Sequence, residues 1–249
     1  MAELSVEIRR KSYPAVGDAP EKLVLRGLRF TVGSGETVVV TGPSGCGKTT
    51  LLNIIAGLER DFEGRIERRA GTRIGYVFQE PRLLPWRTVE DNLRLVLEGE
   101  AAVVDRRIDH ALGEVGLEGV RKVYASHLSL GMARRVAIAR AFVVEPTLLL
   151  MDEPFVSLDE PTAVRLRRLL LELLERHATT TIFVTHNIRE AIMLADRILF
   201  LSAAPSSVVS EVPVSLPRSA RTDEAAIEDF RASLGDLGRL SELRPEPAA

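Results

Sequence analysis

The sequence contains a single cysteine, Cys46, and only four histidines among its 249 residues. One cysteine excludes an internal disulfide framework and a metal site built from several cysteines, and the scattered histidines show no metal-ligand spacing. Lysine is also scarce, because Lys11, Lys22, Lys48 and Lys122 are the only ones against many arginines. A lysine inside a glycine-rich run therefore stands out in this sequence.

The chain also lacks a long apolar run and an excess of charge of one sign. No segment approaches the roughly 20 apolar residues that a membrane-spanning helix needs, and residues 1–10 lack the apolar centre of a signal peptide. Lys and Arg number 33 and Asp and Glu 35, so the formal net charge is -2, without the basic excess typical of nucleic-acid binders. We therefore expect a cytosolic protein with no nucleic-acid partner, although a local basic patch can hide in a neutral total.

Hydrophobic patterns predict strands that alternate with helices, the arrangement of an α/β protein with a parallel, wound sheet. Two earlier strands, at residues 6–10 and 22–31, form an N-terminal antiparallel β part. A helical stretch interrupts the alternation and predicts an inserted subdomain at about residues 80–146. The wound part is expected to have strands at 37–41, 74–78, 147–151, 180–185 and 198–202, and helices at 49–58, 161–176 and 188–195.

One glycine-rich run between an expected strand and an expected helix has the form of a phosphate-binding loop. Glycines let the backbone N–H groups turn toward a polyphosphate, and the start of the following helix adds its positive dipole end. Lys48 would reach the β- and γ-phosphates, and the Thr49 hydroxyl would ligate Mg²⁺. The predicted ATP-binding residues of this run are Gly42, Pro43, Ser44, Gly45, Cys46, Gly47, Lys48, Thr49 and Thr50.

Two adjacent acids, Asp152 and Glu153, follow the apolar residues 148–151. They lie at the carboxyl end of the expected strand, where ligands bind in wound α/β sheets. We predict that Asp152 holds the metal through water and that Glu153 polarises the water that attacks ATP. The alternative is an acidic pair that only caps the helix after Pro154.

Further motifs, in their order along the chain, resemble those of ABC-type ATPases. Residues 128–132, Leu-Ser-Leu-Gly-Met, are similar to the signature sequence of that family and lie just before the acidic strand. Leu130 and Met132 replace the usual glycine and glutamine, which can alter rate or packing, whereas Ser129 and Gly131 are kept. The other landmarks are Gln79, which resembles the Q-loop glutamine, Ser157-Leu158-Asp159, which resembles the D-loop, and Thr185-His186-Asn187, which resembles the switch histidine.

The resemblance covers about residues 4–202 and implies an ATPase that uses ATP and Mg²⁺. In that family two ATPase domains pair head to tail, so Ser129 and the Gly131 backbone would contact the γ-phosphate that the partner chain binds. The resemblance also places Asp159 at the nucleotide, gives Gln79 a part in metal binding and catalysis, and has His186 hold the γ-phosphate and the water. Tyr13 would stack on adenine, or it is an ordinary half-buried tyrosine.

The short stretch from Gln79 to Ser129 leaves no room for the coiled-coil arms of chromosome or repair ATPases. Within the family the chain most resembles importer ATPases for nitrate, sulfonate or taurine-type solutes. This implies a peripheral protein at the cytoplasmic face of the inner or plasma membrane, with a second ATPase subunit, an integral membrane permease and, indirectly, a solute-binding protein as partners. The competing hypotheses are a soluble ABC ATPase that remodels nucleic acid or protein, and a subunit that binds ATP without hydrolysing it.

Two segments have no assigned chemistry. Residues 80–89 form a proline-broken loop in which Trp86 either offers a socket for a partner helix or folds back into the core. Residues 203–249 are expected to be a C-terminal extension of unknown role outside the 1–202 ATPase domain, with one amphipathic helix at 223–234. The sequence names neither the solute nor the permease.

Overall fold

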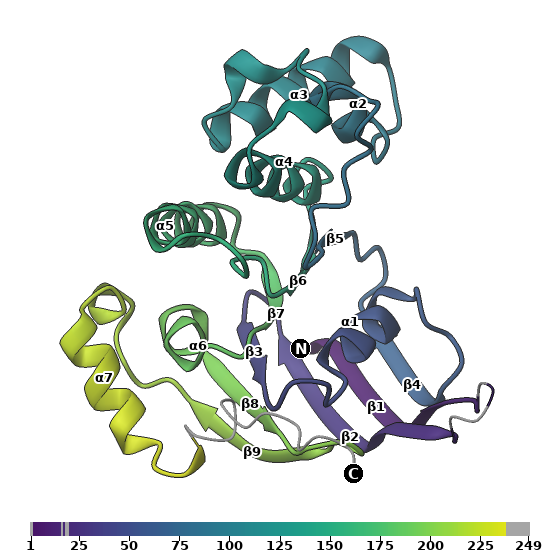
Figure 1. Ribbon diagram of the computed structural model, residues 1–249, viewed down its shortest axis with the longest axis vertical. Coiled ribbons are helices and arrows are strands. Elements are labelled where there is room, and N and C mark those ends of the chain that lie inside the picture. Colours follow the sequence, from purple (N-terminus) through teal and green to yellow (C-terminus); the bar gives the residue numbers. More distant parts are fainter. Residues whose placement is uncertain (1, 16, 18–19, 238–249) are drawn as a thin grey trace. The chain divides into compact units, whose positions relative to one another are not determined.

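A computed structural model of the chain describes residues 2–15, 17 and 20–237 (Figure 1). It separates two compact units, the chain up to residue 70 together with the chain from residue 180 onward, and residues 71–179. Each unit is described by itself below. Residues 238–249 of the expected C-terminal extension, and Asp18 in the loop between the first two expected strands, lie outside the described residues.

The first unit contains a mostly parallel sheet. Strand β3 (Thr37–Thr41) pairs in parallel with β7 (Thr180–Val184) on one side and with β8 (Arg197–Leu201) on the other. Every residue of β3 and β7 is buried, as expected of apolar and β-branched runs that are covered on both faces. Helix α1 (Lys48–Ala56) follows β3, and helix α6 (Ile188–Leu194) follows β7. The predicted wound α/β arrangement is confirmed.

A second, antiparallel sheet in the same unit has the strand order β2-β1-β4, with β1 at Ala2–Tyr13, β2 at Lys22–Gly33 and β4 at Glu63–Arg68 (Figure 1). This is the predicted N-terminal β part, with longer strands than the sequence suggested. Strand β4 was not predicted. Only Ile66 is apolar in this strand and the other residues are exposed, so β4 lacks the alternation by which a strand is recognised.

The chain beyond residue 202 extends the first sheet. Strand β9 (Val208–Pro213) pairs antiparallel with β8, and after a short 3-10 turn (Arg218–Ala220) helix α7 (Glu224–Ser233) packs against α6. The helix matches the predicted one, whereas β9 was not predicted. Its residues are alternately half-buried and exposed, as on an edge strand, so the segment contains no apolar run.

In the second unit, β5 (Ile74–Val77) and β6 (Leu148–Asp152) pair in parallel. The chain between them forms α2 (Val89–Arg94), α3 (Ala101–Glu114), two 3-10 turns (Glu118–Val120 and Ala125–His127) and α4 (Leu130–Phe142), and α5 (Glu160–His177) follows β6. Helices α2, α3 and α4 lie where the sequence placed the inserted subdomain, and α5 matches the helix predicted at 161–176. The boundaries at 80, 146 and 202 stay predictions.

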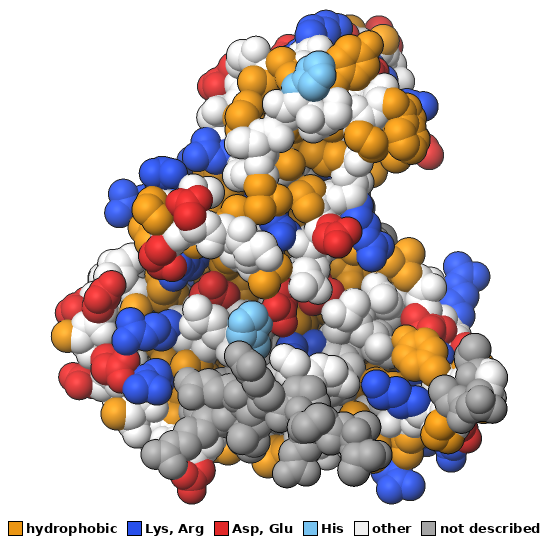
Figure 2. Space-filling model, in the orientation of Figure 1, with side chains coloured by type: hydrophobic (Ala, Val, Ile, Leu, Met, Phe, Trp, Pro, Cys, Tyr) orange, Lys and Arg blue, Asp and Glu red, His pale blue; other side chains and the backbone are white. Residues whose placement is uncertain are grey.

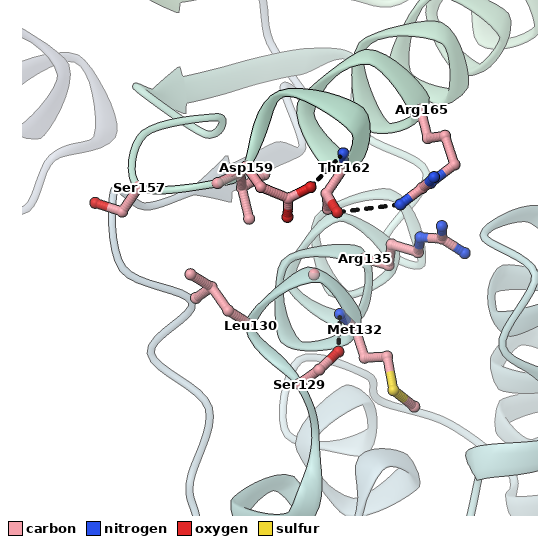
Figure 3. A pocket seen from close by; sticks show the side chains of 10 residues that line it. Ser129, Leu130, Met132, Arg135, Ser157, Asp159, Thr162 and Arg165 are labelled. Atoms are coloured by element: carbon pink, nitrogen blue, oxygen red, sulfur yellow. Dashed lines mark hydrogen bonds between the residues drawn. The ribbon is translucent and has the colours of Figure 1, made fainter.

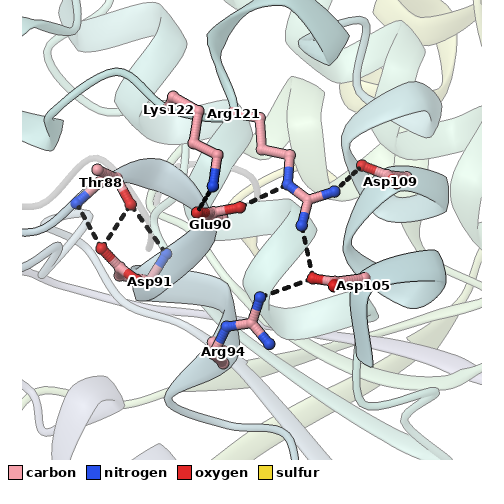
Figure 4. Close-up of polar contacts among 8 residues, drawn as sticks. All are labelled: Thr88, Glu90, Asp91, Arg94, Asp105, Asp109, Arg121 and Lys122. Carbon is pink, nitrogen blue, oxygen red and sulfur yellow. Dashed lines mark hydrogen bonds and ion pairs between the residues drawn. The ribbon is translucent and has the colours of Figure 1, made fainter. Parts of the chain in front are cut away.

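Ion pairs hold the helical part of this unit together (Figure 4). Arg121 lies within 2.6 Å of Glu90 on α2 and of Asp105 on α3, and within 2.5 Å of Asp109 on α3. Lys122 contacts the other oxygen of Glu90. One guanidinium therefore joins two helices, which gives the small helical part a polar brace beside its apolar core.

Large apolar side chains also lie on the surface of the helical part. Trp86 is 71% exposed, and Leu95, Val96 and Tyr124 are exposed as well. Figure 2 shows apolar side chains at the surface of the part that holds α2, α3 and α4. The interpretation in which Trp86 folds back into the core is therefore wrong. No helix in the described part of the chain is long and apolar enough to cross a membrane.

Candidate functional site

The glycine-rich run lies between β3 and α1, as its sequence requires. Lys48 is the first residue of α1 and is buried, and its Nζ donates hydrogen bonds to the carbonyls of Gly42 at 2.8 Å and Pro43 at 3.0 Å. The ammonium group therefore lies over the rim of the loop. Burial raises the pKa of the Cys46 thiol, so this side chain stays neutral and packs as a small apolar group.

Gly47 ends the loop with a backbone that other residues avoid. Its φ is 106°, and a Cβ added to it would lie 2.5 Å from Cγ1 of Val24 and 2.9 Å from Cδ2 of Leu25. Any side chain at this position would therefore collide with β2 as well as strain the backbone. Gly47 is also the N-cap of α1 and has no side chain to cap the helix, so the first N–H groups of α1 remain available to an anion.

The register of the sheet brings His186 to the same edge as this loop. Val40 of β3 pairs with Val184 of β7, and each strand runs in the same direction. The loop begins two residues after Val40, and His186 follows two residues after Val184. His186 is exposed there, and Asn187 after it caps α6 by accepting a hydrogen bond from the N–H of Arg189. The predicted switch histidine thus faces solvent beside the phosphate loop.

Tyr13, at the end of β1, also lies at the loop. Its hydroxyl is 3.2 Å from Oγ1 of Thr50 in the first turn of α1. Nζ of the buried Lys11 lies 4.5 Å from the centre of the ring, and Tyr13 as a whole is 39% exposed. The exposed aromatic face is thus fixed near the start of α1, where an adenine can stack on it.

In the second unit the two acids and Gln79 share one sheet edge. Val77 of β5 pairs with Met151 of β6, so Gln79 and Glu153, each two residues further on, occupy equivalent positions. Asp152 is buried. The pKa of the Tyr76 hydroxyl on β5 is raised by the burial of Tyr76 and by the negative charge of Asp152. Glu153 is half-buried and has a φ of 41°, in the left-handed region. Two carboxylates and an amide thus meet at the carboxyl end of this strand pair.

Arg134 connects the segments that follow these two strands. This residue of α4 is buried, and its guanidinium donates to the carbonyl of Gln79 and, at 3.1 Å, to the carbonyl of Val156. Removing an arginine from water is costly unless such partners satisfy it. Arg134 was not among the predicted site residues, and a charged residue on an otherwise buried helix face was the signal that could have found it.

Residues of the signature-like and D-loop-like segments line a pocket of about 340 Å³ (Figure 3). Ser129 caps α4 by accepting a hydrogen bond from the N–H of Met132 at 3.3 Å. Asp159 caps α5 in the same way, and hydrogen bonds from Thr162 hold the pKa of its carboxyl below the usual value. Gly131 allows α4 to approach α5, because a Cβ on it would lie 2.9 Å from Cγ2 of Thr162.

Residues that bear positive charge complete this pocket. Arg135 of α4 and Arg165 of α5 line it, and Nη2 of Arg165 donates to Oγ1 of Thr162 at 3.1 Å. Leu130, which stands where the signature usually has glycine, is also in the lining and is exposed. A helix start with a serine cap beside two guanidinium groups is suited to an anion.

Comparison with known proteins assigns the family. Residues 25–156 match the ABC transporter family. The chain belongs to this family. The ABC ATPase is 47% identical over 221 residues to the aliphatic sulfonates import ATP-binding protein SsuB 2 of Pseudomonas syringae pv. tomato, a match that covers 88% of this chain and 91% of the relative. The corresponding protein of Bacillus licheniformis is 42% identical, with 86% of each chain covered.

Solved structures agree with this assignment. A dimeric ATP-binding cassette in a post-hydrolysis state, bound to ADP and Pi, has a TM-score of 0.74 and 28% identity, and covers 86% of this chain and 100% of that chain. A subunit of an ABC transporter complex from Clostridium perfringens has a TM-score of 0.73 and 26% identity, with 97% and 99% covered. The ABC ATPase therefore binds and hydrolyses ATP, as its motifs predicted.

The described residues of this ABC ATPase contain no cluster of three or more His, Cys, Asp or Glu side chains that could hold a metal ion by themselves. Its predicted Mg²⁺ ligands are of another kind. Thr49, an exposed residue in the first turn of α1, offers a hydroxyl, and Asp152 offers a carboxylate. Both are hard oxygen donors, which suit a Mg²⁺ ion that takes its other ligands from phosphates and water.

Proposed function

We propose that this ABC ATPase is the subunit that supplies energy to an importer of aliphatic sulfonates. The observation that carries this proposal is its similarity to proteins named as aliphatic sulfonates import ATP-binding proteins, which are 42% to 47% identical over 84% to 94% of this chain. The motifs suggested an importer of nitrate, sulfonate or taurine-type solutes, and these relatives favour the sulfonates among them.

The first unit supplies the nucleotide contacts in this proposal. The backbone N–H groups of residues 44–50 surround the phosphates, and Lys48, which already lies over the loop carbonyls, moves its ammonium onto the β- and γ-phosphates. Tyr13 stacks on the adenine with its exposed face. His186 holds the γ-phosphate from the neighbouring strand end, a role supported by its exposed position beside the loop.

The second unit supplies the groups for hydrolysis. Glu153 accepts a proton from the attacking water, a role for which a half-buried carboxylate at a strand end is suited. Asp152 and Gln79 of this unit are proposed ligands of Mg²⁺, directly or through water, and Thr49 of the first unit is the third. When bound, the ion neutralises charge that develops on the phosphates. Gln79 is exposed on the segment that Arg134 ties to α4, so its backbone is positioned by the helical part.

A second copy of the chain completes each ATP site in our proposal. Ser129, the N–H groups at the start of α4 and Asp159 form a pocket that is positively charged at its rim and has no nucleotide phosphate of its own chain assigned to it. The γ-phosphate held by the partner fits this chemistry. Solved relatives with a TM-score of 0.74 are described as dimeric, which supports the same arrangement here.

The remaining partners follow from import. A permease in the membrane binds the loop that carries Trp86, since a 71% exposed tryptophan in a proline-containing loop is a typical anchor for a partner helix. The ATPase then lies at the cytoplasmic face of the membrane, without crossing it. A separate solute-binding protein delivers the sulfonate to the permease and has no contact with this chain.

Uptake in the organism that carries the chain tests the proposal. Deletion of the gene should abolish ATP-dependent uptake of a labelled alkanesulfonate, and a plasmid copy of the wild type should restore it. A copy with Glu153→Gln should not restore uptake although the protein accumulates normally. Unchanged uptake after deletion, or restoration by Glu153→Gln, would remove the proposed function.

A further inference from the structure

Ser206, in the connection between β8 and β9, touches the phosphate loop from outside. It is completely buried, and its Oγ donates a hydrogen bond of 2.7 Å to the carbonyl oxygen of Cys46. Its own backbone pairs with β2, because its N–H donates to the carbonyl of Val24 at 2.8 Å and its carbonyl accepts from the N–H of Arg26 at 3.0 Å. Two backbone hydrogen bonds therefore hold Ser206 to β2, and its hydroxyl is directed to the loop.

This hydrogen bond fixes the orientation of one peptide group. The carbonyl of Cys46 and the N–H of Gly47 belong to the same planar, trans peptide, in which the C=O and N–H bonds point in opposite directions. Because the carbonyl oxygen is bound to Ser206, the N–H of Gly47 must point away from Ser206. The direction of the Gly47 N–H is thus set by a residue outside the loop.

The Cys46–Gly47 peptide is also packed tightly against β2. Gly47 lies against Val24 and Leu25 so closely that no Cβ fits there, and Ser206 bridges to the same strand at Leu25. A glycine peptide is the most easily reoriented in a chain, since Gly loses more conformational freedom on folding than any other residue. The Ser206 hydroxyl is the one polar side chain shown to hold the Cys46 carbonyl within the described residues.

We propose that Ser206 is a positioning residue for ATP binding, which aims the N–H of Gly47 into the phosphate loop through its hydrogen bond to Cys46. The proposal rests on the proposed role of residues 42–49 as the phosphate site. It gives part of the C-terminal extension a function in nucleotide binding. Ser206 itself touches no phosphate.

Nucleotide affinity of the full-length protein tests this, with ADP as the probe. Ser206→Ala removes the hydroxyl and keeps the backbone pairing with β2. Losing one hydrogen bond should raise the Kd for ADP about three- to tenfold in calorimetry. For ATP turnover, KM should rise by a similar factor and kcat should stay within about twofold, as expected when ground-state binding is lost.

Ser202→Ala is the matched control. Ser202 lies in the same connection, and its Oγ donates to the carbonyl of Ala203 at 3.0 Å and accepts from the N–H of Ser207 at 3.1 Å, without touching the loop. It should leave the Kd for ADP unchanged. Ser206→Cys keeps a weak donor of similar size and should give an intermediate Kd.

The outcomes separate the two proposals. An unchanged Kd for ADP in Ser206→Ala, or an equal rise in Ser202→Ala, overturns the role of Ser206. If Ser206→Ala does not fold, Ser206→Cys decides, and a wild-type Kd in that variant overturns the role. A wild-type protein that binds no ADP, or a Lys48→Ala variant with an unaltered Kd, rejects the phosphate site itself.

Discussion

Glu153 combines an acidic side chain with a backbone that acidic residues rarely adopt. Its φ of 41° lies in the left-handed region, and Ser157, four residues later, has a φ of 64°. A left-handed residue other than glycine costs about 1–3 kcal/mol, and such residues gather at functional sites. This conformation bends the chain directly after the buried strand β6, at the residue that carries the carboxylate. The left-handed backbone at Glu153 therefore supports the role proposed for it at the reaction centre.

Glu153→Gln should separate binding from turnover. The amide keeps the shape of the side chain but cannot accept a proton from water, so kcat should fall at least about 100-fold while the Kd for ATP stays within about twofold. Phosphate release and calorimetry measure the two quantities. Glu160→Gln, an exposed acid at the start of α5, is the control and should keep normal turnover. Normal turnover in Glu153→Gln would assign the proton transfer to another residue.

Lys48→Ala should instead weaken binding. The ammonium lies 2.8 Å and 3.0 Å from two loop carbonyls, within reach of any phosphate that the loop accepts. A hydrogen bond to a charged group contributes about 1.5–3 kcal/mol, so the Kd for ATP should rise by roughly one to two orders of magnitude. Lys22→Ala on the exposed part of β2 removes the same charge away from the loop and should change the Kd little. Equal effects of both variants would mean that net charge, and not Lys48, matters.

At the scale of the elements, burial decided what the sequence could predict. Strands β3, β6 and β7 are buried along their whole length, so their apolar runs identified them and, with them, the loop and the acids at their ends. Strands β4 and β9 contain no buried residue, and although β9 has three valines, neither strand forms the apolar run by which the buried strands were recognised. Long-range partners were equally invisible, because the contacts of Arg134 and Ser206 join residues far apart in the sequence.

The ion pairs between α2 and α3 give a stability prediction for the helical part. Burial alone would raise the pKa of the Glu90 carboxyl, but hydrogen bonds from Lys122 and Arg121 hold this pKa below its usual value. Arg121→Ala removes the contacts to three carboxylates and should lower the free energy of unfolding by about 1–3 kcal/mol. Lys122→Ala, which removes a highly exposed partner of the same Glu90, should cost about 0.5 kcal/mol or less.

The pH dependence of this loss has a defined sign. A carboxyl whose pKa is lower in the folded state stabilises the protein above its unfolded pKa, and the stabilisation disappears as the pH falls through the folded pKa. The difference between wild type and Arg121→Ala in urea unfolding should therefore be full near pH 7 and shrink below about pH 4. A difference that stays constant down to acidic pH would show that Arg121 acts through packing and not through charge.

At the scale of the whole molecule, the ATPase has a second pocket, apart from its phosphate loop, that we propose binds an anion. The pocket beside Ser129 is formed entirely by α4, α5 and the segment between β6 and α5. If a second copy supplies the γ-phosphate, ATP should drive association, because ADP lacks the group that this pocket binds. Hydrolysis then removes the link between the two copies, and the nucleotide sets the oligomeric state.

Light scattering with the Glu153→Gln variant tests this, since slow turnover preserves ATP. The protein should be dimeric with ATP and monomeric with ADP. Adding Ser129→Asp should abolish the ATP-dependent dimer, because aspartate still caps α4 as well as serine does but its charge repels the partner's γ-phosphate. Ser126→Ala, at an exposed serine three positions earlier, should leave the dimer intact, and the Kd for ADP should be normal in both. If the Ser129→Asp protein still dimerises with ATP, the γ-phosphate binds outside this pocket. If the Glu153→Gln protein is dimeric with ADP as well, association does not depend on the γ-phosphate.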